Sequence, residues 1–370
     1  MTDAPINNFS LLARGKSFIS RYERHISTAA FVAGFIFDNL TLTRIDAPLT
    51  IFALGTHLSF AALLILLFQV FESGFVKWTP LLRLGALLPI AIQFSFGALA
   101  SGFFIFFSRS GSLTTSYPFL LFLGALLIGN EVLRTRYARL AFQLAVFFTM
   151  LLSFSALFVP VFLGKMGAGV FLMSVAFALA LFRLFLIILS WIAKERLQQS
   201  RRAVFISVWG IASFFTLLYF WNIIPPIPLS LKHIGVYHFV ERQGSGYRVS
   251  FEQTKKFLLF DAESRAFHAR ADEPVYVFSS VFAPTKLQTV IFHELYYLDE
   301  ANGEWRLASR IPFPIVGGRD AGYRVWSMKE RATPGQWRVD VATGRGQLVG
   351  RIVFDVVVSE TEPELTVSVR

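Results

Sequence analysis

Seven long apolar runs before residue 225 constrain the fold more than any other feature of the sequence. A helix needs about 20 apolar residues to cross a hydrocarbon core of roughly 30 Å, and no run of comparable length follows residue 224. The runs cover residues 27–42, 47–71, 80–107, 112–133, 138–163, 167–192 and 203–224. They predict an α-helical transmembrane bundle of about seven helices. The first run is short and contains Asp38 and Asn39, so a re-entrant or interfacial segment, and a count of six spans, is the alternative.

Basic residues favour one orientation of these spans, because Lys and Arg are retained on the cytoplasmic side during insertion. One alternating set of segments carries most of them: Arg14, Lys16, Arg21, Arg24, Lys77, Arg134, Arg136, Lys194, Arg196, Arg201 and Arg202. The other set carries Arg44, Arg109 and Lys165, one in each loop. We therefore expect a multi-pass bacterial inner-membrane protein with a cytoplasmic N-terminus and a periplasmic region after residue 224. An even number of spans would reverse the second expectation.

The charge of the chain supports the same interpretation. A net charge of +11 could indicate a nucleic-acid binder, but 54% apolar residues fit a soluble nucleic-acid-binding domain badly. Residues 1–230 hold 17 Lys and Arg against 7 Asp and Glu, whereas residues 231–370 hold 18 against 17. The excess therefore belongs to the membrane half, where it can meet anionic lipid. We expect membrane lipids as partners and no nucleic acid.

Proline and charge mark the boundaries of four segments. Residues 1–26 form a basic cytoplasmic N-terminal segment, either an amphipathic helix on the inner leaflet or a frayed tail. Residues 27–224 form the transmembrane helical domain. Residues 225–231 contain Pro225, Pro226 and Pro228, which cannot continue a helix and favour an extended spacer. Residues 232–370 form the extracytoplasmic β-domain.

Alternation of apolar and polar residues replaces the apolar runs in the C-terminal part. Short alternating stretches recur at residues 247–251, 275–282, 287–298, 305–311, 323–328, 336–341 and 348–358. Such runs, separated by Gly, Pro, Asn and Asp, predict an all-β immunoglobulin-like sandwich. Gly344 and Gly346 lie between the last two stretches, where a hairpin turn needs positive φ.

Two parts of the chain resemble a family of bacterial integral membrane proteins that is named for its C-terminal domain of unknown function 2914. The first is residues 34–46, and the second comprises His293, Trp305, residues 324–327 and residues 334–341. The family usually has an aromatic residue two positions after the histidine, where this chain has Leu295. The resemblance implies a multi-helix membrane part with a small extracytoplasmic β-domain, and it implies no reaction.

Polar residues inside the apolar runs are candidates for function, because a charge in hydrocarbon costs about 2.5 kcal/mol or more. Asp38, His57, Gln93 and Arg183 lie away from the predicted cytoplasmic ends, and Arg183 is near mid-span. One interpretation is a polar cluster inside the bundle that holds an anionic headgroup or relays a proton. The other is a structural salt bridge with hydrogen bonds that fix helix packing.

The β-domain offers a second set of candidates, in which aromatic rings could stack on sugars or grip a partner. They are His293, Tyr296, Trp305, Arg324 and Trp326. The alternative is that such aromatic residues fill the core of the sandwich.

Motifs for metal, cofactor or catalysis give no further candidates. Position 297 is Tyr where a zinc-protease motif beginning at His293 needs a second histidine, and His233 and His238 are a weak ligand pair. The chain has no cysteine, which excludes disulfides, cysteine-ligated metals and thiol catalysis. No nucleophile elbow, P-loop or dinucleotide fingerprint occurs. We therefore predict no cofactor, no metal and no catalytic residue.

These observations favour a non-enzymatic inner-membrane protein that presents a periplasmic β-domain for recognition of an envelope protein, glycan or lipid. The alternative is a transporter or lipid-handling protein that uses the cluster of Asp38, His57 and Arg183. A membrane-embedded enzyme is a third hypothesis, which lacks a recognisable nucleophile and base.

Overall fold

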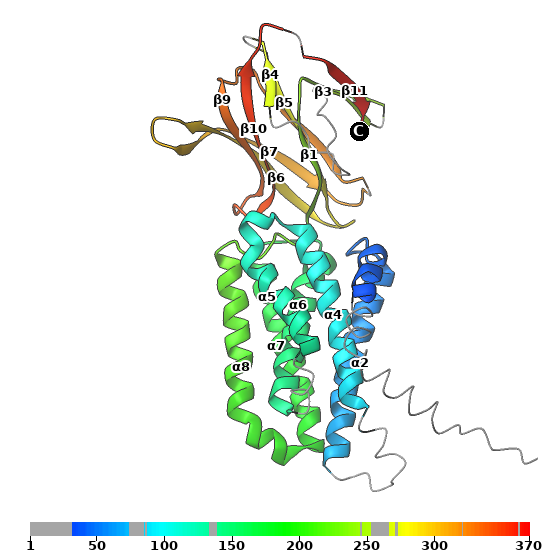
Figure 1. Ribbon diagram of the computed structural model, residues 1–370. Helices are drawn as coiled ribbons and strands as arrows, with labels where there is room; N and C mark the ends of the chain where they lie inside the picture. Colours follow the sequence, from blue (N-terminus) through cyan, green and yellow to red (C-terminus); the bar gives the residue numbers. More distant parts are fainter. Residues whose placement is uncertain are drawn as a thin grey trace, which may run out of the picture. The chain divides into compact units, whose positions relative to one another are not determined.

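The computed structural model describes residues 32–73, 85, 87–132, 139–244, 246–252, 266–270, 273–319, 321–361 and 363–370 (Figure 1). The chain divides into two compact units, residues 1–44 and 45–370. In the first unit, residues 32–41 form a helix that corresponds to the end of the first predicted span. The predicted basic segment, residues 1–26, lies outside the described residues, as do Lys77, Arg134 and Arg136.

Six further helices belong to the second unit, so the described residues hold seven helices, as predicted. The six are α2 (Pro48–Glu72), α4 (Leu88–Ser110), α5 (Leu113–Val132), α6 (Leu140–Leu163), α7 (Ala168–Ile192) and α8 (Lys194–Phe220). All of these except α5 are long and apolar enough to cross a membrane, judged by length and composition. The helical part of the predicted fold class is thus confirmed at this level.

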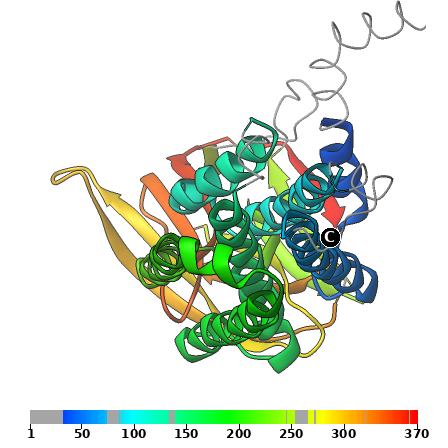
Figure 2. The same ribbon diagram turned by 90° about the horizontal axis from the view of Figure 1, so that it is seen from below.

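Helix α6 is the central helix of the bundle, which Figure 2 shows along the helices. It packs against α2, α4, α7 and α8, and its side chains are the most enclosed of the five long apolar helices. Aromatic rings fill the contacts: Phe147 lies 4.8 Å from Phe185, and Phe119 of α5 lies 5.4 Å from Phe215 of α8, between ring centroids. Apolar side chains thus pack the bundle around α6.

Helix α8 begins earlier than the sequence indicates. Residues 193–202 form no loop between two spans, because α7 ends at Ile192 and α8 begins at Lys194. Residues 194–202 contain Lys, Glu, Arg, Leu and Gln without Gly or Pro, and such residues favour helix. Arg196, Arg201 and Arg202 therefore lie on the first turns of a helix.

The proline-rich segment differs from the extended spacer that we predicted. Residues 224–229 are buried, and two turn hydrogen bonds, from Ile227 N–H to Pro225 O and from Leu229 N–H to Pro226 O, fold the segment. The reason is that a proline has no N–H group, so it can be buried without leaving a donor unsatisfied. Helix α8 is therefore joined to the first strand through a packed turn.

Eleven strands form three sheets in the C-terminal part. They are β1 (Ser230–Tyr237), β2 (Phe239–Gln243), β3 (Gly246–Glu252), β4 (Ala266–Ala269), β5 (Val275–Phe282), β6 (Gln288–Asp299), β7 (Glu304–Val316), β8 (Tyr323–Lys329), β9 (Gly335–Thr343), β10 (Leu348–Val358) and β11 (Leu365–Val369). The sheet orders are β1-β5-β8, β4-β10-β9-β6-β7 and β11-β3-β2. Only β4 and β10 pair in parallel.

The core of this β-sandwich lies between the first two sheets. Val277 of β5 packs with Trp337 and Val339 of β9 in one buried cluster. The opposite face of β5 carries Phe278, which packs with Val249 of β3 in another cluster. Successive residues of β5 thus point to opposite faces, as strand geometry requires, and the sheet β1-β5-β8 is covered on both sides.

Seven of these strands match the predicted stretches, and β10 matches residue for residue. Strands β1, β2, β4 and β11 were not predicted. Strand β7 continues through Pro312 and Pro314 to Val316, which is possible because β7 is at the end of its sheet, where a missing N–H costs no ladder bond. In the β9–β10 turn, Gly346 has φ +80° as predicted, whereas Gly344 does not lie in the positive-φ region.

Candidate functional site

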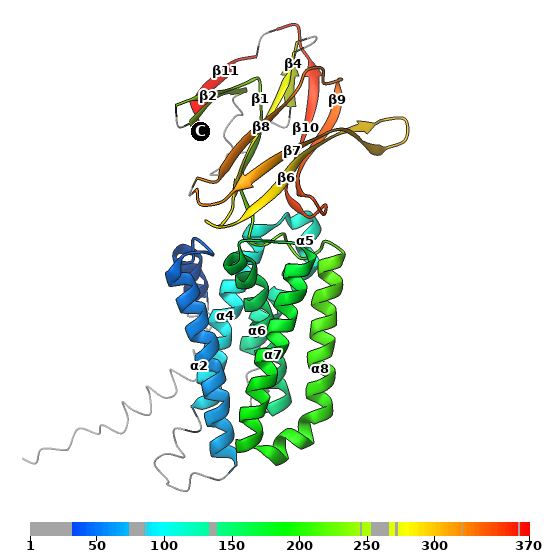
Figure 3. The ribbon, with the colours of Figure 1, turned by 180° about the vertical axis from the view of Figure 1, so that it is seen from behind.

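The outer face of the five-stranded sheet carries an unusual row of polar and aromatic side chains. Alternation along β6 sends Ile291 and Leu295 into the core and Phe292, Glu294 and Tyr296 to the opposite face. The register then sets their neighbours: Glu294 is opposite Asp340 and Tyr296 is opposite Arg338 on β9. Figure 3 shows β6 and β7 as a long hairpin at this edge of the sheet.

Arg310 of β7 joins two members of this face. Its guanidinium carbon lies 4.1 Å from the ring centroid of Phe292, and its Nε is 3.0 Å from Glu294 Oε1. The hydroxyl group of Tyr296 donates a hydrogen bond of 2.9 Å to Glu294 Oε2. Burial raises the pKa of Tyr296, and the hydrogen bond to Glu294 adds to this effect, so the hydroxyl remains a donor.

Arg338 occupies the centre of the face. Its guanidinium carbon lies 4.3 Å from the ring centroid of Tyr296 and 4.8 Å from that of Trp305, and its Nε is 3.4 Å from Asp340 Oδ2. Arg351 of β10 donates to both carboxylate oxygens of Asp340, with Nη2 at 2.7 Å from Oδ2. This hydrogen bond raises the pKa of Arg351. We call these eight residues the outer-face row: Phe292, Glu294, Tyr296, Trp305, Arg310, Arg338, Asp340 and Arg351.

The structure divides the predicted β-domain residues among three places. Tyr296 and Trp305 belong to the outer-face row. Trp326 is exposed on β8, in the other sheet, 5.6 Å from Tyr276 between ring centroids. Arg324, also on β8, donates to the backbone oxygen of Arg370. The structure therefore does not bring these residues to one face.

His293, the fifth predicted residue, is fully buried and contributes no surface. Its ring joins three strands, with Nε2 at 2.7 Å from Ser279 Oγ of β5 and Nδ1 at 2.8 Å from Ser327 Oγ of β8. Burial lowers the pKa of His293 to about 3, so the imidazole is neutral, with one nitrogen as donor and the other as acceptor. Its role in the fold is that of a polar link inside the sandwich.

Four residues that the sequence did not indicate belong to the outer-face row: Arg310, Arg338, Asp340 and Arg351. Asp340 is 5% exposed, and a buried carboxylate needs partners. The alternation in residues 336–341 was a usable signal for Arg338 and Asp340, which lie two positions apart and so share a face. Their pairing with Tyr296 depends on strand register, which the sequence does not state.

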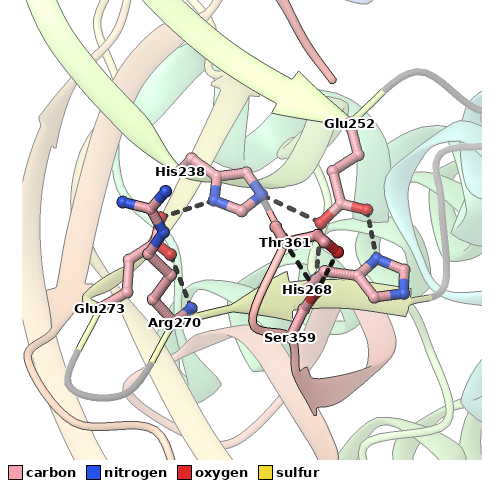
Figure 4. A network of polar contacts seen from close by, with 7 residues as sticks. All are labelled: His238, Glu252, His268, Arg270, Glu273, Ser359 and Thr361. Carbon is pink, nitrogen blue, oxygen red and sulfur yellow. Dashed lines mark hydrogen bonds and ion pairs between the residues drawn. The ribbon is translucent and has the colours of Figure 1, made fainter. Parts of the chain in front are cut away.

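A second polar cluster joins the starts and ends of β2, β3, β4 and β5 (Figure 4). His238 lies between two carboxylates, with Nδ1 at 2.7 Å from Glu273 Oε1 and Nε2 at 3.0 Å from Glu252 Oε1, and its ring stacks on Phe267 at 4.1 Å. Glu252 also accepts from the ring and backbone N–H groups of His268. Burial raises the pKa of Glu252, but the hydrogen bonds from both histidines outweigh it and the net pKa is lowered.

Histidines of this cluster are not arranged as metal ligands. His233, which the sequence pairs with His238, contacts the hydroxyl group of Tyr237 instead. Within the described ranges, no group of three or more His, Cys, Asp or Glu residues could hold a metal ion.

The predicted intramembrane residues lie in different parts of the helical region. Asp38 belongs to the helix over residues 32–41, which is in the other compact unit. His57 is half-buried on α2, 5.9 Å from the ring of Phe94, and Gln93 is half-buried on α4. Arg183 is exposed on the surface of α7, which differs from the interior position that we expected.

The helices hold another polar chain that the sequence analysis missed. Gln69 of α2 donates to Gln143 of α6 at 3.2 Å, and Arg196 of α8 donates to Gln69 at 2.9 Å. Arg196 also pairs with Glu72 at 3.2 Å. Both glutamines are fully buried, so this chain ties three helices together.

Comparison with known proteins identifies the C-terminal domain. Residues 288–356 match the family described as protein of unknown function (DUF2914), and no curated protein matches the chain. A solved structure, the Pseudomonas fluorescens alkylpurine DNA glycosylase AlkC bound to DNA containing an abasic site analog, aligns with 85% of this chain and 99% of its own at 10% identity. Its TM-score of 0.20 carries no argument about fold or function. The chain therefore has a C-terminal domain of the DUF2914 family, which includes β9 and most of β6 and β10.

Proposed function

We propose that this is a non-enzymatic bacterial inner-membrane protein that presents an immunoglobulin-like β-domain to the periplasm and binds an envelope glycan through the outer-face row. The observation that carries the proposal is the arrangement of Arg338 between Tyr296, Trp305 and Asp340. Rings and carboxylates hold the guanidinium groups in place before any partner arrives, which lowers the entropic cost of binding. Three arginines and two carboxylates suit a polar ligand with weak negative charge, and the rings suit the apolar faces of sugars.

The ends of the helices support this orientation. Asp46 before α2 accepts hydrogen bonds from Thr285, and Gly164 after α6 accepts one from Gln288. Loops near the β-domain thus belong to the set with few basic residues, whereas Lys194 and Arg196 lie at the opposite end of α8. The positive-inside rule places that end in the cytoplasm.

Polar contacts support fixed presentation of the domain. Asn222 after α8 donates to the backbone oxygen of Arg345 at 3.1 Å, and Gln347 donates to that of Ile224 at 3.3 Å. The guanidinium carbon of Arg345 lies 4.5 Å from the ring centroid of Tyr219. A domain held at several points keeps its binding face in a defined direction.

Orientation is tested by cysteine labelling of intact cells, because the natural chain has no cysteine and gives no background. Asn302, in the turn between β6 and β7, and Gln199, near the start of α8, are both exposed. We expect an impermeant thiol reagent to label Asn302→Cys and to label Gln199→Cys only after the membrane is opened. The reverse pattern would refute the periplasmic location.

Binding is tested with the full-length protein in detergent and two probes, isolated peptidoglycan and lipopolysaccharide. Trp305→Ala and Arg310→Ala should each weaken retention on one of these probes by roughly tenfold, the size of a lost stacking or charged contact. Trp326→Ala, on the other sheet, is the matched control and should retain the probe. Equal loss for all three variants, or no retention of either glycan, would contradict the proposal; capture of an envelope protein through the row would replace the glycan by a protein partner.

The alternative function, a transporter or lipid-handling protein that uses Asp38, His57, Gln93 and Arg183, has weaker support. The exposed position of Arg183 suits contact with lipid better than proton transfer inside the bundle. Reconstituted protein should then show no proton flux that depends on Arg183. A flux that disappears in Arg183→Leu would favour the alternative.

A further inference from the structure

A cavity of about 710 Å³ lies where α6 and α7 approach the β-domain. Its walls come from the end of α6, the first turns of α7, the start of α2 and residues 284–286 between β5 and β6. The volume is within the range of roughly 300–1,000 Å³ found for small-molecule sites. No residue of the outer-face row lines it, so the cavity is a separate feature.

The cavity has an apolar body and a polar rim. Phe154, Phe158 and Phe162 of α6 face Met173 and Phe177 of α7 across it. Ser155 also lines the wall, but its hydroxyl group donates to Leu151 O within α6. The charged lining residues, Asp46 and Lys286, are both at the rim beside Thr285. Such a division matches a ligand with a long apolar part and one polar end.

Positive charge is available at the rim. The Asp46 carboxylate accepts from the backbone N–H group of Thr285 at 3.2 Å and from its hydroxyl group at 3.1 Å, so local donors already engage it. Lys286 is exposed and forms no ion pair with any other described residue. Gly164 touches the Lys286 backbone, and the exposed Lys165 follows it, which brings a second lysine to this end of α6.

We propose that the cavity binds a phosphate-bearing lipid, with an acyl chain between α6 and α7 and the phosphate group at Lys286 and Lys165. Burial of each methylene group away from water is worth about 0.8 kcal/mol, and an ammonium group is a common partner for phosphate. The site lies at the membrane–water interface if the helices span the bilayer, so a lipid enters sideways without leaving the membrane. Glycan binding by the outer-face row and lipid binding here are independent.

The test uses full-length protein in phosphatidylcholine vesicles that contain a trace of phosphatidic acid with a diazirine on the acyl chain. After illumination, labelled peptides are mapped by mass spectrometry. We expect label in residues 154–163 and 173–177 at roughly fivefold or more the density on the lower part of α7, residues 181–191. Two further probes, the same chain on phosphatidylcholine and on a free fatty acid, separate the phosphate requirement from a requirement for negative charge alone.

Matched variants separate the cavity from the general lipid-facing surface. Met173→Trp fills the cavity, whereas Leu184→Trp adds the same bulk on the same helix outside it; both native side chains are 54% exposed, so neither change disturbs the core. We expect Met173→Trp to reduce cavity labelling at least about fivefold and Leu184→Trp to leave it unchanged. Lys286→Gln should reduce labelling by phosphatidic acid roughly fivefold, and Lys329→Gln on β8 should not.

Three outcomes would overturn the proposal. Label spread over all exposed helix faces and insensitive to Met173→Trp would show bulk lipid only. Equal labelling by phosphatidylcholine and by phosphatidic acid, unaffected by Lys286→Gln, would remove the role of the lysine. Preferential labelling by the free fatty acid would exclude a phosphate. Each variant is accepted only if it elutes as a single species and melts like the natural protein.

Discussion

Buried polar groups are satisfied locally in the helical part but across distant strands in the β-domain. In the helices, Ser155 and Ser174 donate to the carbonyl group four residues earlier in the same helix. In the β-domain, His293 bonds to Ser279 and Ser327 on two other strands. The difference teaches that a helix can absorb a polar side chain on its own, whereas a sandwich needs the correct partner from another part of the chain.

The same comparison separates the two parts by charge. Interstrand partners in the β-domain include titratable groups, among them His293, Glu252 and Asp340. The interhelical chain of Gln69 and Gln143 contains amides, with Arg196 at its end. We therefore expect acid and charge substitutions to affect the β-domain first, and the following predictions test this from the largest effect to the smallest.

Asp340→Ala should destabilise the β-domain most, by about 3 kcal/mol, because it leaves Arg351 and Arg338 without their shared carboxylate in a partly buried place. Urea unfolding followed by tryptophan fluorescence measures the change in the free energy of unfolding. Asp355→Ala, on an exposed position of β10, is the control and should cost less than about 0.5 kcal/mol. Equal effects of the two substitutions would show that the ion pairs contribute nothing.

Acid should destabilise the β-domain through His293. Its pKa is about 3 in the folded state against an ordinary value of 6.5, so the unfolded chain binds a proton that the folded chain does not. Stability is therefore complete above pH 6.5 and is lost as the pH falls toward 3, by about 1.4 kcal/mol per pH unit, or about 2 kcal/mol between pH 6.5 and 5.

The control is His293→Gln, which keeps a polar side chain without a proton to bind in this range. The unfolding free energy of this variant should show a pH slope smaller by about 1.4 kcal/mol per unit than that of the natural protein. Part of the slope should remain, because burial and Arg370 also lower the pKa of His233, to about 4. An unchanged slope would rule out His293 as the acid-sensitive group.

Gln143→Leu tests the helical side of the comparison. It leaves the buried Gln69 amide without its acceptor, which should cost about 1.5 kcal/mol and lower the melting temperature of the helical circular dichroism signal in detergent. The double variant Gln69→Leu/Gln143→Leu should cost less than the two single changes added together, because both partners are then removed. A strong pH dependence of this loss would weaken the contrast between the two parts.

Gly346→Ala should have the smallest effect, about 1 kcal/mol, because φ at this position is +80° and an L side chain is strained there. Gly344→Ala is the matched control in the same turn, since Gly344 is outside the positive-φ region and its added methyl group would meet only Phe292 at 3.7 Å. Chemical unfolding of the two variants under identical conditions measures the difference. A larger loss for Gly344→Ala would contradict the turn geometry.

The fold was more predictable than the candidate site. Apolar runs and alternation are local signals, so they indicated the helices, seven strands and the DUF2914 domain. Strands β2 and β4 are short, and β1 and β11 have mixed exposure, which leaves little periodicity to read. Residues 193–202 were misread because charge was taken as a sign of a loop, although these residues favour helix.

What the sequence by itself determined was the division into an apolar helical part and an alternating β part, because hydrophobic periodicity depends only on neighbours along the chain. Only the tertiary structure decided that Tyr296 and Trp305 share Arg338, that His293 is a buried link, and that Lys286 lies above an apolar cavity. These arrangements join residues far apart in the sequence, such as Asp46 and Thr285. They depend on strand register and on how helices pack, and neither is encoded in the spacing of any one segment.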